Sequence, residues 1–93
     1  MTITVRYFGQ LRVLTGKEEE RVTCSSDTRL FFLICRLGEQ YGQNFRLITL
    51  NEDTSSLRAS LIILMDGQAV DKAKSVVAKE TKEISLFTAI AGG

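Results

Sequence analysis

The sequence predicts a small α+β domain in which a single helix lies across one face of a sheet of four to five strands. Three observations predict it. A strand-like alternation opens the chain at residues 2–8, a helical period occupies residues 30–41, and strand-like segments return at 61–65 and 83–87. Ninety-three residues support one hydrophobic core, so we expect one domain over residues 1–88.

The first two strands are expected to form an antiparallel hairpin. Residues 2–8 alternate with the period of a half-buried strand, and residues 18–24 form a second, more weakly patterned strand. Between them, residues 10–15 are bracketed by two glycines and predict a connection whose Leu11 and Leu14 turn back onto the core. The apolar side of the first strand consists of Ile3, Val5 and Tyr7.

The main helix follows a polar segment, residues 25–28, whose side-chain oxygens offer several N-caps. Gly42 is a natural stop. Gly38 inside the helix costs about 1 kcal/mol relative to alanine, so packing against the sheet must supply most of the stability. The helical apolar positions are Leu30, Leu33, Ile34, Leu37 and Tyr41.

The second half of the chain is expected to return to the sheet. Residues 43–60 show no sustained period and predict an exposed connection. Its first half is expected to be anchored by Phe45, Leu47, Ile48 and Leu50. Residues 61–65 read as a strand, and Asp66-Gly67 is a dipeptide favoured in tight hairpin turns. Residues 72–81 are compatible with a helical turn, and residues 83–87 alternate as a last strand.

Composition excludes several classes of function. A formal charge of +1 is not the basic excess that nucleic-acid binding needs, and the longest apolar run, residues 30–35, is too short to span a bilayer. We therefore expect a cytoplasmic protein without a signal peptide.

The absence of histidine removes the usual general base and the commonest metal ligand, so we expect neither a metal site nor self-contained hydrolysis. Cys24 and Cys35 are expected to be buried free thiols.

The chain closes on a slim tail, residues 89–93, that ends in Gly92-Gly93. At average glycine usage a terminal pair arises by chance in roughly 0.5% of chains, and a frayed end is the simplest alternative. The glycines follow Phe87 by only a few residues, however, and lack side chains that would keep the tail out of a narrow channel. Fully extended, the tail reaches at most about 16–18 Å, enough to enter the active site of another protein.

The carboxylate of Gly93 is a poor electrophile at neutral pH, because it is ionised well above its pKa of about 3.5. Adenylation would activate it. The sequence has no phosphate-binding loop around Gly9 or Gly16, so we expect no bound cofactor and a partner enzyme that uses ATP.

With these elements in place, the chain resembles the ubiquitin-like β-grasp sulfur carriers, and among them the small subunits of molybdopterin synthase. The resemblance spans essentially the whole length. The matching segments are residues 5–12 (VRYFGQLR), 15–16 (TG), 27–28 (DT), 62–67 (IILMDG), 84–87 (ISLF) and 91–93 (AGG).

The resemblance implies a mixed β-grasp sheet and a non-catalytic carrier. Gly93 would be adenylated by an activating enzyme of the ubiquitin-activating (E1) type and converted to a thiocarboxylate. Gly92, with Ala91 and Ile90, would thread the tail into the large subunit of molybdopterin synthase, where sulfur passes to a pterin precursor. Phe8 and Phe87 match positions of partner contact in the family, although packing within the domain explains them equally well.

Two departures from the family pattern bear on the partner. The family usually has Gly-Asp before the last strand and Pro-Pro after it, whereas this chain has Thr81-Lys82 and Thr88-Ala89. The connection over 43–60 is longer than in the thiamine-pathway carriers. The alternatives are a modifier conjugated through Gly93 to lysines, a carrier for thiamine, cysteine or tRNA thiolation, and a non-covalent interaction module.

Overall fold

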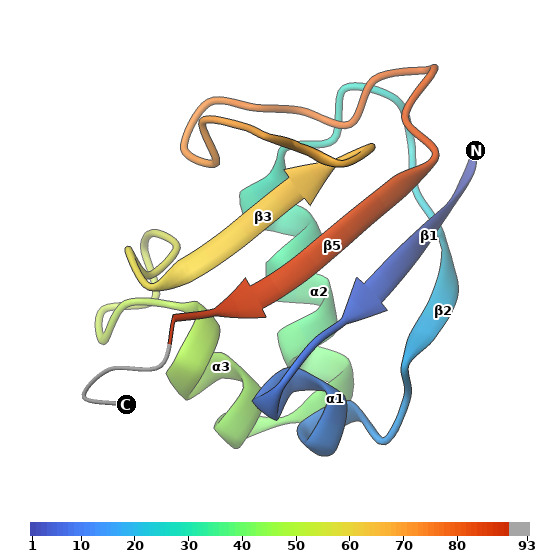
Figure 1. The fold of residues 1–93 in the computed structure, drawn as a ribbon. Helices are drawn as coiled ribbons and strands as arrows, with labels where there is room; N and C mark the ends of the chain where they lie inside the picture. The colour runs from blue at the N-terminus through green and yellow to red at the C-terminus, as the bar shows by residue number, and fades with distance from the viewer. Residues whose placement is uncertain (90–93) are drawn as a thin grey trace.

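The computed structural model describes residues 1–89, which form a five-stranded sheet with helices packed on one face (Figure 1). The main helix behind the sheet confirms the predicted α+β arrangement. In chain order the elements are β1 (Thr2–Tyr7), α1 (Gln10–Thr15), β2 (Glu19–Thr23), α2 (Leu30–Tyr41), α3 (Gln43–Thr49), β3 (Leu61–Met65), β4 (Gln68–Ala69) and β5 (Glu83–Thr88).

The sheet is mixed, with strand order β2-β1-β5-β3-β4. β1 and β2 form the predicted antiparallel hairpin, and β3 is antiparallel to both β4 and β5. The two central strands, β1 and β5, are parallel, with Tyr7 opposite Leu86. Because parallel strands end at the same edge of a sheet, the residues that follow β1 lie beside the C-terminal end of β5.

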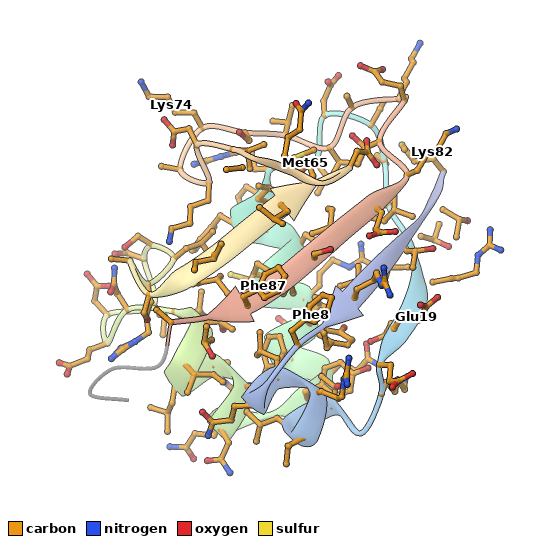
Figure 2. All side chains as sticks on the ribbon, viewed as in Figure 1. Phe8, Glu19, Met65, Lys74, Lys82 and Phe87 are labelled. Carbon is orange, nitrogen blue, oxygen red and sulfur yellow. The ribbon has the colours of Figure 1, made fainter. Side chains whose placement is uncertain are left out.

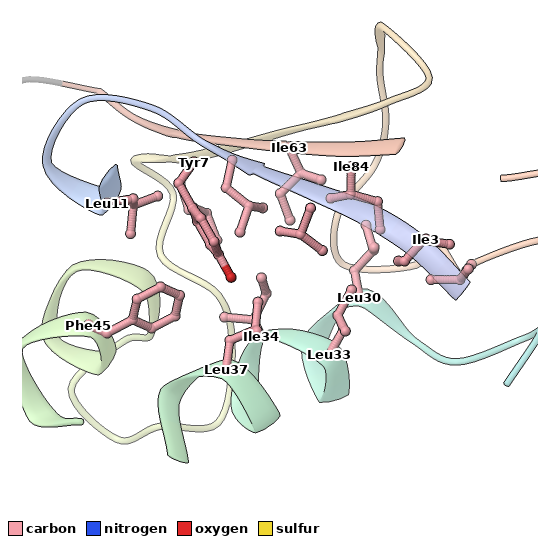
Figure 3. Packing of buried hydrophobic residues seen from close by; sticks show 14 of the residues in the cluster. Ile3, Tyr7, Leu11, Leu30, Leu33, Ile34, Leu37, Phe45, Ile63 and Ile84 are labelled. Carbon is pink, nitrogen blue, oxygen red and sulfur yellow. The ribbon is translucent and has the colours of Figure 1, made fainter. Parts of the chain in front are cut away.

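The core lies between the sheet and α2, and its members from β1 and α2 follow the predicted periods (Figure 3). The inward side of β1 is at most 1% exposed. Burial of each such side chain contributes about 1.5–3 kcal/mol to folding. The helix contributes Leu30, Leu33, Ile34 and Leu37 to the same core.

The prediction that residues 43–60 form an exposed connection is wrong for its first part. Residues 43–49 form the helix α3. The predicted anchoring by Phe45, Ile48 and Leu50 is confirmed, whereas Leu47 is 57% exposed. Two helical turns are too short to show a sustained apolar period, which explains the error. Residues 10–15, predicted as a connection, likewise form the short helix α1, and its Leu11 is buried as expected.

Gly38 is explained by the contact between α2 and α3. A Cβ atom added there would lie 2.7 Å from Cγ of Arg46. The Arg46 side chain packs against Gly38, and its Nη1 donates a hydrogen bond to the Gly38 carbonyl oxygen at 2.8 Å. The glycine therefore makes room for the arginine that joins the two helices.

The predicted side-chain N-cap of the main helix is also incorrect. The N-cap residue is Arg29, and it makes no side-chain cap bond. The Leu30 N–H instead donates to the carbonyl oxygen of Ser75, and the Val77 N–H donates to that of Thr28. The segment predicted to hold a helical turn, residues 72–81, has one such turn at its start, where the Ser75 N–H donates to the Asp71 carbonyl oxygen. A second, tighter turn joins the Thr81 N–H to the Ala78 carbonyl oxygen, and the segment covers the start of α2 without forming a helix.

The Asp66-Gly67 turn is confirmed. Both residues have positive φ, 50° and 83°, as a type I′ turn requires. Asp66 Oδ1 also accepts hydrogen bonds from the N–H groups of Lys82 and Glu83, at 3.0 and 2.9 Å, which fixes the start of β5.

A cluster of polar groups fastens the edge strand β2 to the rest of the domain. The Glu20 carboxylate accepts hydrogen bonds from the hydroxyls of Tyr7, at 2.5 Å, and Tyr41, and from Lys17 Nζ at 3.3 Å. Desolvation opposes ionisation of Glu20, but the bonds from Tyr41, Tyr7 and Lys17 outweigh it and lower the pKa of Glu20. Burial, together with the neighbouring carboxylate, raises the pKa of Tyr7.

Both cysteines are free thiols, Cys24 buried as predicted and Cys35 only half-buried on α2. Within residues 1–89, no helix combines the length and apolar character needed to cross a membrane.

Candidate functional site

The C-terminal tail leaves the sheet at the end of β5 and is held there by β3. Thr88 pairs with Leu61, and the Ala89 N–H donates to the Ser60 carbonyl oxygen at 2.8 Å. Attachment to the sheet therefore extends one residue beyond the strand. Four residues remain, spanning at most about 14 Å when extended.

The four residues to which the sequence assigns the chemistry lie outside the described part of the chain. They are Ile90, Ala91, Gly92 and Gly93. The described residues show where this segment begins and which surface surrounds its point of departure.

Phe8 and Phe87 stack on the face of the sheet that the helices leave open (Figure 2). Their ring centroids lie 4.3 Å apart with an interplanar angle of 8°. The parallel pairing of β1 and β5 brings them together, since the Phe8 N–H donates to the Leu86 carbonyl oxygen at 3.2 Å. Both rings are half-buried and lie outside the core cluster. Their packing is therefore mutual and on the sheet surface, where a partner can reach them.

Two arginines flank this ring pair. The guanidinium carbons of Arg6 and Arg12 lie 5.7 and 5.8 Å from the Phe8 ring centroid, within the range of cation–π attraction. Arg6 also forms ion pairs with Glu19 at 3.7 Å and Glu83 at 3.5 Å. All these side chains are more than a third exposed, so the pairs contribute about 0–1 kcal/mol each and exchange readily for a partner's charges.

Ile62 completes this surface and was not identified from the sequence. It lies opposite Phe87 in the register of β3 and β5 and is 45% exposed. All five residues of the run 61–65 are apolar, so the sequence pattern does not show which of them faces outward. Because side chains alternate along a strand, counting from a buried Leu61 would have placed Ile62 on the outer face.

We call the surface formed by Phe8, Phe87, Ile62, Arg6 and Arg12 the open-face aromatic surface. Aromatic and arginine side chains are enriched at protein–protein interfaces, and exposed apolar patches rimmed by polar groups mark interaction sites. A surface of this composition therefore lies beside the point where the tail begins. Among residues 1–89, no group of three or more histidine, cysteine, aspartate or glutamate side chains is arranged to hold a metal ion.

Comparison with known proteins supports the same architecture. The family profile described as the ThiS family matches residues 5–93. SAMP1 from Haloferax volcanii is similar with a TM-score of 0.79 and 19% identity, covering 100% of both chains. A putative molybdopterin converting factor subunit 1 from Pyrococcus furiosus has a TM-score of 0.70 and 19% identity, over 97% of this chain and 99% of that one.

The Amycolatopsis orientalis BexX/CysO complex contains a similar chain, with a TM-score of 0.69 and 19% identity, over 98% of this chain and 99% of that one. No curated protein matches the sequence significantly. At these identities the structural likenesses establish the fold, which is the ubiquitin-like β-grasp fold.

Proposed function

Because the chain belongs to the ThiS family, we propose that it is a sulfur carrier that bears a thiocarboxylate on Gly93 and supplies sulfur for molybdenum cofactor biosynthesis. The observation that carries the proposal is the path of β5. This central strand leads from the open-face aromatic surface directly into the tail, which the sheet holds through Ala89. A partner that binds the surface therefore receives the C-terminus at a defined place.

The chemistry requires an E1-like adenylating partner. The Gly93 carboxylate attacks the α-phosphorus of ATP and pyrophosphate leaves, which produces an acyl adenylate. A hydrosulfide ion (HS⁻) released by a donor then attacks the carbonyl carbon and loses its proton, and AMP leaves with one of the original carboxylate oxygens, so that sulfur has replaced this oxygen. The chain itself is a non-catalytic substrate in both steps and binds no cofactor.

The large subunit of molybdopterin synthase would then receive the tail. Residues 90–93 carry no side chain larger than Ile90, so a narrow channel admits them while the folded body remains outside. We propose that both partners use the open-face aromatic surface, with Phe8 and Phe87 as anchors. Because both partners use this one surface, they bind one after the other.

Intact-mass measurement tests the proposal. The chain is incubated with its adenylating enzyme, ATP and a sulfur donor, and we expect a mass gain equal to the difference between sulfur and oxygen, located on the C-terminal peptide. A variant lacking Gly93 is the matched control and should remain unmodified. The adenylating enzyme is first shown to form AMP-anhydrides, for example by its exchange of pyrophosphate with ATP. If the mass of the full chain then remains unchanged, the proposal is refuted.

The pathway is tested separately. The thiocarboxylated chain is mixed with the large synthase subunit and the pterin precursor, and we expect sulfur transfer with return of the carboxylate mass. Transfer only to thiamine, cysteine or tRNA-thiolation acceptors would retain the carrier chemistry and reassign the pathway.

A second candidate is a protein modifier joined through Gly93 to lysines of other proteins. The likeness to small archaeal modifier protein 1 of H. volcanii favours it, with a TM-score of 0.73 over 96% of this chain. Proteolysis of cell extract should then leave Gly-Gly remnants on foreign lysines. Their absence from cells that contain the active conjugating enzymes would exclude this role.

A further inference from the structure

A small groove lies on the helix-covered side of the domain, opposite the open-face aromatic surface. It is bounded by the start of α2, by residues 55–57 and by residues 72–73, and has a volume of about 140 Å³. Its apolar walls come from Phe31 and Leu57, both of which also pack against the core. Ser55 and Ser56 add hydroxyl groups to the rim.

The groove is cationic. Arg29 and Lys72 line it, and none of its lining residues carries a carboxylate. The Arg29 guanidinium is held in place over the Phe32 ring, 5.7 Å from the centroid, and donates a hydrogen bond to the Ala73 carbonyl oxygen at 3.4 Å. Lys72 Nζ donates to the Ala59 carbonyl oxygen at 3.0 Å. Neither cation takes part in an ion pair within residues 1–89.

These charges are therefore positioned by backbone carbonyls without being neutralised. Burial lowers the pKa of Lys72, because the ammonium is partly desolvated. A carboxylate brought beside it would stabilise the charged form and reverse that shift. The electrostatic complement of the groove is thus an anion.

The size of the groove selects among anions. Pockets for nucleotides and other small ligands typically enclose about 300–1,000 Å³, so this groove is too small for them and suits a single side chain. The walls of Phe31 and Leu57 favour an apolar neighbour of the charged group. Phe32, 54% exposed, extends the apolar surface beyond the groove.

We propose that this groove binds an acidic segment of a partner protein, with an aspartate or glutamate side chain between Arg29 and Lys72 and an adjacent apolar side chain on Phe31 and Leu57. The groove is separate from the open-face aromatic surface, because its lining comes from the start of α2 and from residues 55–57 and 72–73, whereas Phe8 and Phe87 lie on the face that the helices leave open. A protein bound there can hold the carrier while an enzyme acts on Gly93.

Selection from a random heptapeptide display library tests the proposal. The full-length chain is the bait, and peptides that bind the double variant R29Q/K72Q are removed. We expect the remaining peptides to contain an acidic residue next to an apolar one. A synthetic peptide of the enriched sequence should shift the amide NMR signals of Arg29, Phe31, Leu57 and Ala73.

Matched substitutions complete the test. R29Q alone should weaken that peptide at least tenfold, and so should replacement of the peptide's acidic residue by its amide. The control variants R21Q and K79Q remove one exposed cation each, elsewhere on the surface, and should bind normally. Because R29Q removes the hydrogen bond to Ala73 and the contact with the Phe32 ring, thermal unfolding serves to confirm that the variant remains folded.

Four outcomes would overturn the proposal. They are the absence of enrichment, enriched peptides without acidic residues, shifts confined to the open-face aromatic surface, and equal or tighter binding of inorganic phosphate at the groove. A chain lacking residues 90–93 identifies one further competitor. If this deletion alone shifts the NMR signals of the groove residues and strengthens binding of the peptide there, the chain's own C-terminus occupies the groove. The assignment to a partner protein is then wrong.

Discussion

Replacement of Glu20 by glutamine tests whether a charged hydrogen-bond acceptor secures the edge strand β2. The Glu20 side chain is only 14% exposed, and its carboxylate accepts from Tyr7, Tyr41 and Lys17. Glutamine preserves the shape and one acceptor oxygen but removes the charge.

The expected loss follows from the bonds. A hydrogen bond to a charged group contributes about 1.5–3 kcal/mol net, against about 1 kcal/mol for a neutral one. Two tyrosine hydroxyls lose this difference, so E20Q should lower the free energy of unfolding at pH 7 by about 2 kcal/mol, equivalent to about 8–16 °C in Tm for a domain of this size.

The loss should depend on pH with a defined sign. The pKa of Glu20 is lowered in the folded state, so its stabilisation is fully present above the unfolded pKa of about 4.3 and is lost as the pH falls through the folded value. The difference between wild type and E20Q should therefore be constant near neutrality and shrink below about pH 4.

Urea unfolding monitored by circular dichroism at several pH values measures this difference. E19Q is the matched control, because Glu19 is 57% exposed and makes only a surface ion pair at 3.7 Å. That variant should lose less than about 1 kcal/mol. A loss from E20Q below about 0.5 kcal/mol at pH 7, or one that does not change with pH, would refute the reasoning.

Three further substitutions probe the fold and the contact surface. G38A should destabilise by about 1–2 kcal/mol in urea unfolding, because its Cβ meets Arg46 Cγ at 2.7 Å; a gain in stability, as helix propensity alone predicts, would contradict this. D66A should cost about 1–2 kcal/mol, since it removes the acceptor of two backbone N–H groups and strains a residue at φ 50°, whereas D66N should lose clearly less. F87A should weaken binding of the adenylating enzyme about tenfold or more in titration calorimetry. The control T2A changes a residue of β1 on the same face of the sheet and should bind normally; equal binding of F87A would remove Phe87 from the contact surface.

Much of the fold could be predicted because the responsible signals are local. The alternation of residues 2–8, the helical period from Leu30 to Tyr41 and the Asp66-Gly67 turn each depend on neighbouring residues, and each is confirmed. The tail glycines were identified in the same way, although residues 90–93 lie outside the described structure and their role remains a prediction.

Tertiary contacts decided the remaining features. α3 is stabilised by burial of Phe45, and the start of α2 is capped by a carbonyl 45 positions further along the chain, that of Ser75, so neither feature has a local signal. Likewise, only the parallel pairing of β1 with β5 stacks Phe8 on Phe87 and sets Ile62 beside them. The sequence by itself determined the periods, the turn and the chemistry available at the C-terminus, because these follow from residue type and spacing. The contact surface beside the tail, and the cationic groove behind the sheet, exist only because folding brings distant segments together.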